Sequence, residues 1–149
     1  MLRISEIPEA ERSALRTMAD AYWHEIMPRI VQDPARLAQY FETRFAAGTG
    51  RNQQWRAKLD QIVVGFANAE LLMDDMGDTY GYLKDFYILP EWRRQGHGAA
   101  FARLVFQWIK EHGARRVSLH TRLDSPAATA FWQHLGCEPR LYIMRKPLD

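Results

Sequence analysis

The sequence is poor in cysteine, and Cys137 is the only one among its 149 residues. A single thiol cannot build a disulfide framework, and it supplies no pair of thiolates of the kind that structural zinc sites use. Chains without disulfides are typical of reducing compartments. We therefore expect a cytoplasmic protein without a metal centre.

Long apolar runs and a dominant charge are also missing. No run approaches the roughly 18 apolar residues that a membrane span needs, and residues 1–16 lack the apolar stretch of a signal peptide. The 20 basic and 18 acidic residues leave a net charge of only +2. Since no basic face with interleaved aromatics offsets this balance, we predict neither a membrane nor a nucleic-acid partner.

Apolar residues make up 47% of the chain, which at this length is enough for one sizeable core. No internal repeat, low-complexity tract or linker interrupts the sequence. We therefore expect residues 1–149 to form a single domain.

Local patterns predict a mixture of strands and helices. Strands are expected at Leu2–Ile4, Gln53–Leu59, Ile62–Leu72, Tyr80–Leu89, Arg116–Thr121 and Arg140–Lys146, and helices from Pro8 to before Pro28, from Asp33-Pro34 to Gly48, from Gly98 to Gly113 and from Ser125-Pro126 to Leu135. The central strands favour an antiparallel meander, and the later strand, helix and strand form a crossover that requires a parallel pair. The expected fold class is mixed α+β.

The start of the long helix has the composition of an anion site. Free backbone N–H groups at a helix start bind anions, and Gly96 and Gly98 remove side chains where a pyrophosphate would approach. Arg93 and Arg94 add cationic donors. Dinucleotide and ATP loops are disfavoured, because Phe101 breaks the G-x-G-x-x-G pattern and the lysine and hydroxyl pair of an ATP loop is missing. The glycine spacing alone fits a plain turn equally well.

The segment RRQGHG, directly after DFYILPEW, closely resembles the coenzyme A signature [Q/R]-x-x-G-x-[G/A] of the GNAT superfamily of N-acyltransferases. Downstream, SPAATAFWQHLGC resembles the second cofactor segment of that family, commonly N-x-x-A-x-x-x-Y before a Gly-Phe pair. The resemblance covers residues 80–145. It implies the GNAT fold, in which the parallel strand pair splays into a V, and acetyl-CoA as co-substrate without a metal.

In this family the main chain holds much of the cofactor. The resemblance implies that the Phe86 N–H faces the thioester carbonyl and that Ile88 meets the pantetheine amides, at a bulge of their strand. The amides from Arg93 to Ala99 would hold the pyrophosphate. The segment around Ser125 and Phe131 would line the other wall of the cofactor slot. The implied cofactor-binding residues are Phe86, Tyr87, Ile88, Arg93, Arg94, Gln95, Gly96, His97, Gly98, Ala99, Ser125 and Phe131.

Acyl transfer to an amine needs a neutral nitrogen, a donor for the developing oxyanion and a proton for the leaving thiolate. The Phe86 N–H is the predicted oxyanion donor. The tyrosine that often acts as acid in this family is replaced by Trp132, whose indole cannot supply a proton in this pH range. Tyr142, on the last predicted strand, is a candidate substitute, and water is the alternative.

The base is not evident from the sequence. Glu70 and His120 are candidates, whereas period-two alternation places Asp85 on the face opposite to Tyr82 and Lys84. We interpret Asp85 mainly as a structural hydrogen-bond acceptor.

The sequence says less about which residues bind the amine acceptor. The resemblance places the connection between the first two helices at the acceptor pocket, so that its aromatics, Tyr22 and Trp23, and His24 either line this pocket or belong to the core, which we favour. Glu25 or Asp33 would attract a cationic amine.

The leading hypothesis is therefore transfer of acetyl from acetyl-CoA to a primary amine of a small molecule, peptide or protein, by direct attack in a ternary complex. One alternative is a catalytically degenerate acyl-CoA-binding module, and another is a domain whose glycine loop binds nothing. The resemblance is also compatible with a homodimer.

Overall fold

The computed structural model describes residues 1–27, 32–45 and 51–148. Its elements are, in chain order, β1 (Leu2–Glu6), the 3-10 helix η1 (Glu9–Leu15), α1 (Arg16–Ile26), α2 (Pro34–Arg44), β2 (Asn52–Leu59), β3 (Ile62–Met73), β4 (Thr79–Ile88), the 3-10 helix η3 (Pro90–Trp92), α3 (His97–Glu111), β5 (Val117–Leu119) and α4 (Pro126–His134). The chain divides into two compact units, Met1–Leu119 and His120–Asp149, and each is described by itself.

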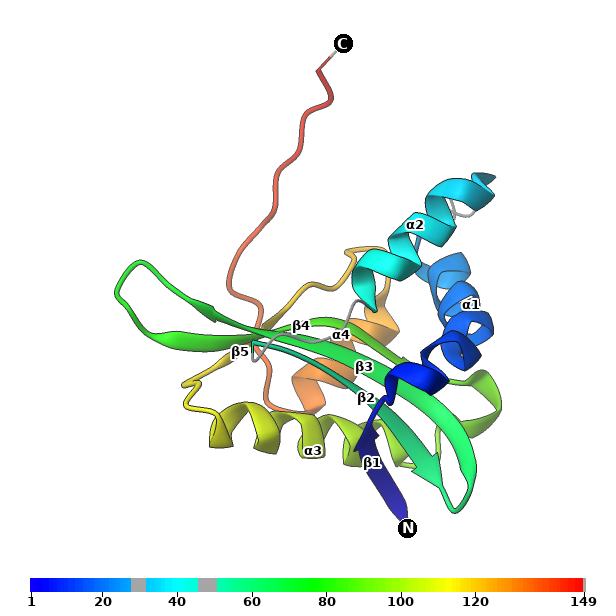
Figure 1. Ribbon diagram of the computed structural model, residues 1–149. Helices are drawn as coiled ribbons and strands as arrows, with labels where there is room; N and C mark the ends of the chain where they lie inside the picture. The colour runs from blue at the N-terminus through cyan, green and yellow to red at the C-terminus, as the bar shows by residue number, and fades with distance from the viewer. Residues whose placement is uncertain (28–31, 46–50, 149) are drawn as a thin grey trace. The chain divides into compact units, whose positions relative to one another are not determined.

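The first unit contains a five-stranded sheet in the order β1-β2-β3-β4-β5 (Figure 1). The first four strands form an antiparallel meander. β4 and β5 are parallel, with Gly81 to Leu83 opposite Val117 to Leu119, and α3 makes the crossover between them. The predicted α+β fold with a parallel strand pair is confirmed.

Helices pack on both faces of this sheet (Figure 1). On one face lie α1 and α2, where the ring of Tyr22 lies 5.4 Å from that of Phe66. α3 covers the other face, with the rings of Trp55 and Trp108 5.2 Å apart. On that face Gly81 packs closely on α3, because a Cβ there would lie 2.4 Å from a methyl carbon of Ile109 and would force that side chain to shift. The two faces therefore have separate aromatic cores.

Local sequence features explain where the helices begin. The Asp33 carboxylate accepts a hydrogen bond of 3.2 Å from the Arg36 N–H, and Pro34 occupies the first turn, as predicted. The predicted end of this helix at Gly48 lies outside the described residues. The predicted first helix is divided, since the 3-10 helix η1 precedes α1. No helix of the described residues is long and apolar enough to cross a membrane.

The second unit contains α4, in which the rings of Phe131 and Trp132 meet edge to face at 4.7 Å. The predicted last strand, Arg140–Lys146, is wrong, because residues 137–148 adopt no regular secondary structure. A strand needs a hydrogen-bonded neighbour, and the described part of this unit holds no other strand. Pro139 and Pro147 border the segment and lack an N–H to donate. Alternating polarity alone could not reveal the missing partner.

Candidate active site

β4 carries a bulge at Lys84. Asn68 of β3 lies opposite Asp85, but the next residue, Ala69, lies opposite Leu83, so that Lys84 has no partner in the register. Leu83 is also the last residue of β4 that pairs with β5. Among the described strands, the part of β4 beyond the bulge therefore has a neighbour on the β3 edge alone.

The register fixes the direction of the main-chain groups beyond the bulge. The Leu89 N–H donates to the Val64 carbonyl at 2.9 Å. Hydrogen-bonded pairs alternate along an antiparallel ladder, so Tyr87 also bonds toward β3, while Phe86 and Ile88 direct their main-chain groups to the opposite edge. These are the two residues whose main chain was expected to meet the thioester and the pantetheine.

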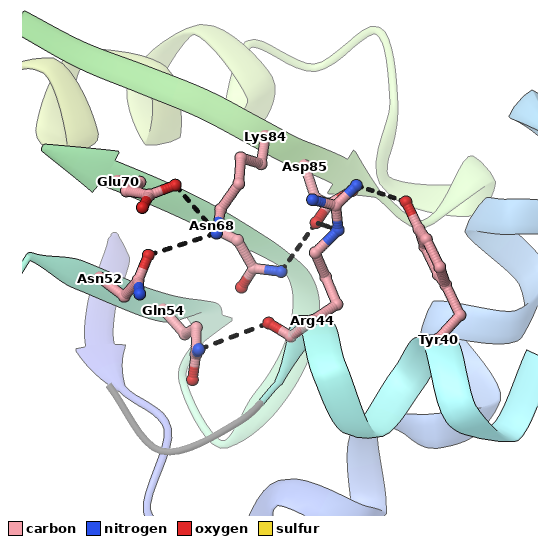
Figure 2. A network of polar contacts seen from close by, with 8 residues as sticks. All are labelled: Tyr40, Arg44, Asn52, Gln54, Asn68, Glu70, Lys84 and Asp85. Atoms are coloured by element: carbon pink, nitrogen blue, oxygen red, sulfur yellow. Dashed lines mark hydrogen bonds and ion pairs between the residues drawn. The ribbon is translucent and has the colours of Figure 1, made fainter. Parts of the chain in front are cut away.

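The bulge overturns the predicted facing of Asp85. An extra residue shifts the alternation, so Asp85 and Lys84 lie on the same face, the one covered by α1 and α2 (Figure 2). The Lys84 ammonium donates to Asn52 Oδ1 at 3.2 Å, and the Asp85 carboxylate lies 3.0 Å from Nε of Arg44 on α2. Simple period-two parity cannot predict such a change, because it assumes an unbroken strand.

Asp85 is only 2% exposed and is held by three polar neighbours. Its Oδ2 accepts a hydrogen bond from Asn68 Nδ2 at 2.9 Å and lies 3.0 Å from Arg44 Nε. The Tyr22 hydroxyl also donates to this carboxylate. Burial raises the pKa of Asp85, against the opposing effects of Arg44 and of the two hydrogen bonds. The carboxylate thus connects α1, α2 and β3 to the bulge, as a structural acceptor would.

Tyr22 serves both the core and the bulge. Its ring lies among those of Phe66 and Tyr87, at 5.4 and 5.3 Å. Burial and the charge of Asp85 raise the pKa of its hydroxyl, while a hydrogen bond from the Phe86 main chain opposes this increase. The hydroxyl is therefore neutral near pH 7 and lies beside the predicted oxyanion donor.

Glu70 lies on the same face, one strand away from the bulge (Figure 2). Its carboxylate is 3.7 Å from the Lys84 ammonium, and its side chain is 32% exposed. Unlike Asp85, Glu70 is accessible from solvent. Of the predicted bases in the first unit, it is the one that a substrate can approach.

The turn before α3 fits an anion. Gly96 is the N-cap residue, with a φ of 84°, and no side chain caps the helix. A Cβ on Gly96 would meet nothing within 4 Å, so the space in front of the helix start is open. The N–H groups of the first helical residues, His97, Gly98 and Ala99, have no acceptor within the helix. These amides and the helix dipole suit a pyrophosphate.

Arg93 does not extend freely toward this space. Its Nε donates to the Ile88 carbonyl at 2.8 Å, and one terminal nitrogen donates to both carboxylate oxygens of Glu25, at 3.0 and 3.1 Å. The predicted cationic donor for the phosphate is thus bound to α1. Gln95, two residues later, donates to the Glu91 carbonyl at 3.1 Å.

The remaining predicted site residues belong to the second unit. Ser125 is the N-cap residue of α4, although its side chain makes no capping bond. Tyr142 is 87% exposed in the segment that forms no strand. His120, Ser125, Phe131 and Tyr142 all belong to the second unit, and their predicted roles stay predictions.

Sequence reasoning missed Arg44 and Asn68, two of the three residues that bind Asp85. Neither belongs to a motif. Asn68 and Glu70 are polar residues at alternate positions within the apolar run VVGFANAELLM, and this pattern indicates a polar stripe on one face. Within the described residues, no cluster of three or more histidine, cysteine or acidic residues could hold a metal ion.

Comparison with known proteins agrees with the resemblance. Residues 15–137 match the family model described as acetyltransferase (GNAT) family. The aminoglycoside N(6')-acetyltransferase type 1 of Stenotrophomonas maltophilia is 30% identical over 96 residues, which cover 60% of this chain and 63% of that protein. The chain spans less than two thirds of the length of the curated relatives that it matches.

Solved structures share the fold. A putative acetyl transferase from Pyrococcus furiosus has a TM-score of 0.77 at 22% identity, and the match covers 99% of this chain and 100% of that one. An aminoglycoside acetyltransferase from an uncultured soil metagenomic sample, in complex with sisomicin, has a TM-score of 0.76 at 16% identity, covering 99% and 97%. With the family model matching most of the sequence, the chain belongs to the acetyltransferase (GNAT) family.

Proposed function

We propose that this protein is an N-acetyltransferase that moves the acetyl group of acetyl-CoA to a primary amine of a small molecule. One observation carries the proposal: beyond the bulge β4 has no second neighbouring strand among the described residues, and it leads through η3 and a turn into the glycine-capped start of α3. A main-chain edge suits the amides of a pantetheine, and a helix start suits a pyrophosphate. Both parts of coenzyme A thus find a complementary surface on one strand, turn and helix.

In this proposal acetyl-CoA supplies an activated thioester, and the chain supplies its orientation and a hydrogen-bond donor. The assigned donor is the Phe86 N–H, which binds the Tyr22 hydroxyl in the structure and would exchange this partner for the carbonyl oxygen on which charge develops during attack. In other enzymes, loss of one such donor raises the activation free energy by on the order of 3 kcal/mol. A main-chain donor needs no particular side chain, so its position depends on the bulge and on the network around Asp85.

The amine must lose a proton before it attacks. A lysine-like amine with a pKa of about 10.4 is about 3.4 units too basic at pH 7, which corresponds to roughly 4 to 5 kcal/mol. Asp85 is too deeply buried to meet the amine directly, so we assign the base to Glu70, acting through water where needed. Trp132 cannot protonate the leaving thiolate, and water or Tyr142 takes that role.

The acceptor class follows from the relatives and from the polar face beside the bulge. The relative and the structural neighbour named above are aminoglycoside acetyltransferases. In this chain the partly exposed Glu70 carboxylate and Asn52 Oδ1 lie beside the Lys84 ammonium on the face of the sheet that bears α1 and α2, and Glu70 is the acid there that would attract a substrate ammonium group (Figure 2). A small polyamine or amino sugar fits this chemistry better than an acidic or apolar acceptor.

An assay of coenzyme A release tests the proposal. The purified chain is incubated with acetyl-CoA and either sisomicin, a simple diamine or a peptide with a free N-terminus. Turnover with the amino sugar or the diamine supports a small-molecule acceptor. Turnover with the peptide alone would show that the acceptor is a peptide and not a small molecule. Absence of any binding of acetyl-CoA would refute the proposal.

One observation favours a second candidate, an acyl-CoA-binding module without catalysis. Trp132 occupies the position of the expected acid, and the candidate substitute, Tyr142, does not lie on a strand. The same assay separates the two functions. Tight binding of acetyl-CoA without turnover on any amine would support the module.

A further inference from the structure

Arg93 joins three segments of the first unit. Its guanidinium binds the Ile88 carbonyl, at the end of β4, and the Glu25 carboxylate, in the last turn of α1. The same guanidinium lies 5.2 Å from the centre of the Tyr87 ring, and the Tyr87 hydroxyl donates to Glu25 at 3.2 Å. A single terminal nitrogen of Arg93 is thus shared between the two carboxylate oxygens of Glu25, while Nε of the same guanidinium binds the Ile88 carbonyl.

The turn that follows Arg93 has an unfavourable backbone. Arg94 has a φ of 63° and Gly96 a φ of 84°, and the left-handed region disfavours a residue that carries a Cβ. Such conformations persist where the surrounding structure fixes them. The side chain of Arg93 holds the residue immediately before the turn, and the amide of Gln95 holds its middle.

We propose that Glu25 is a positioning residue for the coenzyme A site. By holding Arg93 against α1, it fixes the turn that directs the His97 to Ala99 amides at the pyrophosphate. In this arrangement Arg93 fixes the shape of the site, and its guanidinium does not bind the phosphate. This inference rests on the proposed function, because it needs coenzyme A at the start of α3.

The opposite arrangement makes the opposite prediction. If Arg93 were a phosphate ligand that Glu25 merely occupies in the free protein, neutralising Glu25 would release it and tighten binding. A simple charge effect has the same sign, because removal of a negative charge near an anion favours binding. The direction of the change therefore decides between positioning and competition.

Isothermal titration of coenzyme A at fixed ionic strength tests the proposal. Glu25→Gln is expected to raise the Kd about two- to fivefold, as for a partly exposed ion pair that orients a ligating group. Arg93→Lys keeps the charge but loses the planar fork, so it should weaken binding by a similar factor. The double variant should be no worse than Arg93→Lys alone, because the two residues act through one contact.

Glu91→Gln is the matched control. Glu91 is an exposed acid in η3 next to the same turn, and its carboxylate is in none of the ion pairs between described residues. Its neutralisation changes the local charge as Glu25→Gln does, but leaves Arg93 in place. We expect an unchanged or slightly lower Kd for this variant.

A shorter ligand separates positioning from a general defect of the fold. Pantetheine lacks the pyrophosphate, so in ligand-observed NMR titrations Glu25→Gln should weaken its binding clearly less than that of coenzyme A; a small effect is expected because Arg93 also binds the Ile88 carbonyl. Equal weakening of both ligands, or coenzyme A binding in Glu25→Gln that equals or exceeds that of the wild type, would overturn the inference. Failure of the wild type to bind coenzyme A would instead refute the proposed function.

Discussion

The Asp85 carboxylate lies 3.0 Å from Nε of Arg44, and this pair joins the last turn of α2 to the bulge of β4. The two partners differ in exposure, since the side chain of Asp85 is 1% exposed and that of Arg44 is 25% exposed. Arg44 also donates to the Tyr40 hydroxyl, one turn earlier on α2 (Figure 2). Removal of one partner should therefore have a different consequence from removal of the other.

Arg44→Met is expected to destabilise the protein by about 3 kcal/mol, because it leaves an unpaired carboxylate in the interior. Asp85→Asn should cost only about 1 kcal/mol, because the remaining guanidinium can reach water. Urea unfolding at neutral pH measures both free energies, with Asp75→Asn on the surface as the control. Equal costs for the two variants would contradict this account of the pair.

The pH dependence of stability should carry a contribution from Asp85 with a sign unusual for an acid. Its pKa is raised above the ordinary 3.8, mainly by burial. Between the two values the folded state keeps a proton that the unfolded state has released, so the free energy of unfolding falls as pH rises through this window.

The measurement is the difference between the pH profiles of the wild type and Asp85→Asn, from about pH 4 to about pH 7. Comparison with the variant is needed because other acids have the opposite slope. Hydrogen bonding with Arg116 lowers the pKa of Asp74, for example, and that contribution is lost as pH falls. Parallel profiles would show that Asp85 does not titrate in this range.

Gly96→Glu should abolish coenzyme A binding. The new side chain would place bulk and negative charge in the open space before α3, and the left-handed backbone would cost on the order of 1 kcal/mol in stability. Gly113→Glu is a close control, since Gly113 follows the other end of α3, with a φ of 90° and open surroundings.

Both glycine variants should lose similar stability, and only Gly96→Glu should lose its response to the ligand. Thermal unfolding with coenzyme A measures this, because a ligand at about 100 times its Kd adds roughly 2.7 kcal/mol to stability. If coenzyme A still stabilised Gly96→Glu, the proposed binding of the pyrophosphate at the start of α3 would be refuted.

Glu70→Gln is expected to lower kcat about 100-fold, because a general base contributes factors of this order. The KM for acetyl-CoA should change little. Glu111→Gln, at the exposed end of α3, removes an acid away from the bulge and serves as the control. An unaltered kcat in Glu70→Gln would contradict the assignment of Glu70 and leave His120 or water as the candidate base.

Unfolding of the full chain tests the prediction of a single domain. One cooperative transition, coincident by tryptophan fluorescence and far-UV circular dichroism, is expected if residues 1–149 fold together. Two resolved transitions would instead show that the units Met1–Leu119 and His120–Asp149 unfold independently.

Features that depend on neighbouring residues could be predicted from the sequence. The cap at Asp33, the apolar spacing of α3 and the glycine turn before it each involve residues a few positions apart, and all occur as expected. The meander and its parallel pair followed from element order. The relevant information was local in each case.

Features that depend on distant partners could not be predicted in the same way. Arg44 meets Asp85 across 41 positions, and Glu25 meets Arg93 across 68. No spacing rule links such pairs. Residues 140–146 had the pattern of a strand, but a pattern cannot supply the neighbour that a strand needs.

One turn of α1 spans the two ends of the candidate site. Tyr22 contacts Asp85 at the bulge, and Glu25, three residues later, contacts Arg93 before α3. Because successive helical residues are rotated by about 100°, one residue inserted between them would turn one contact away while the other stayed in place. α1 therefore acts as a fixed-length spacer, in which substitutions are better tolerated than changes in length.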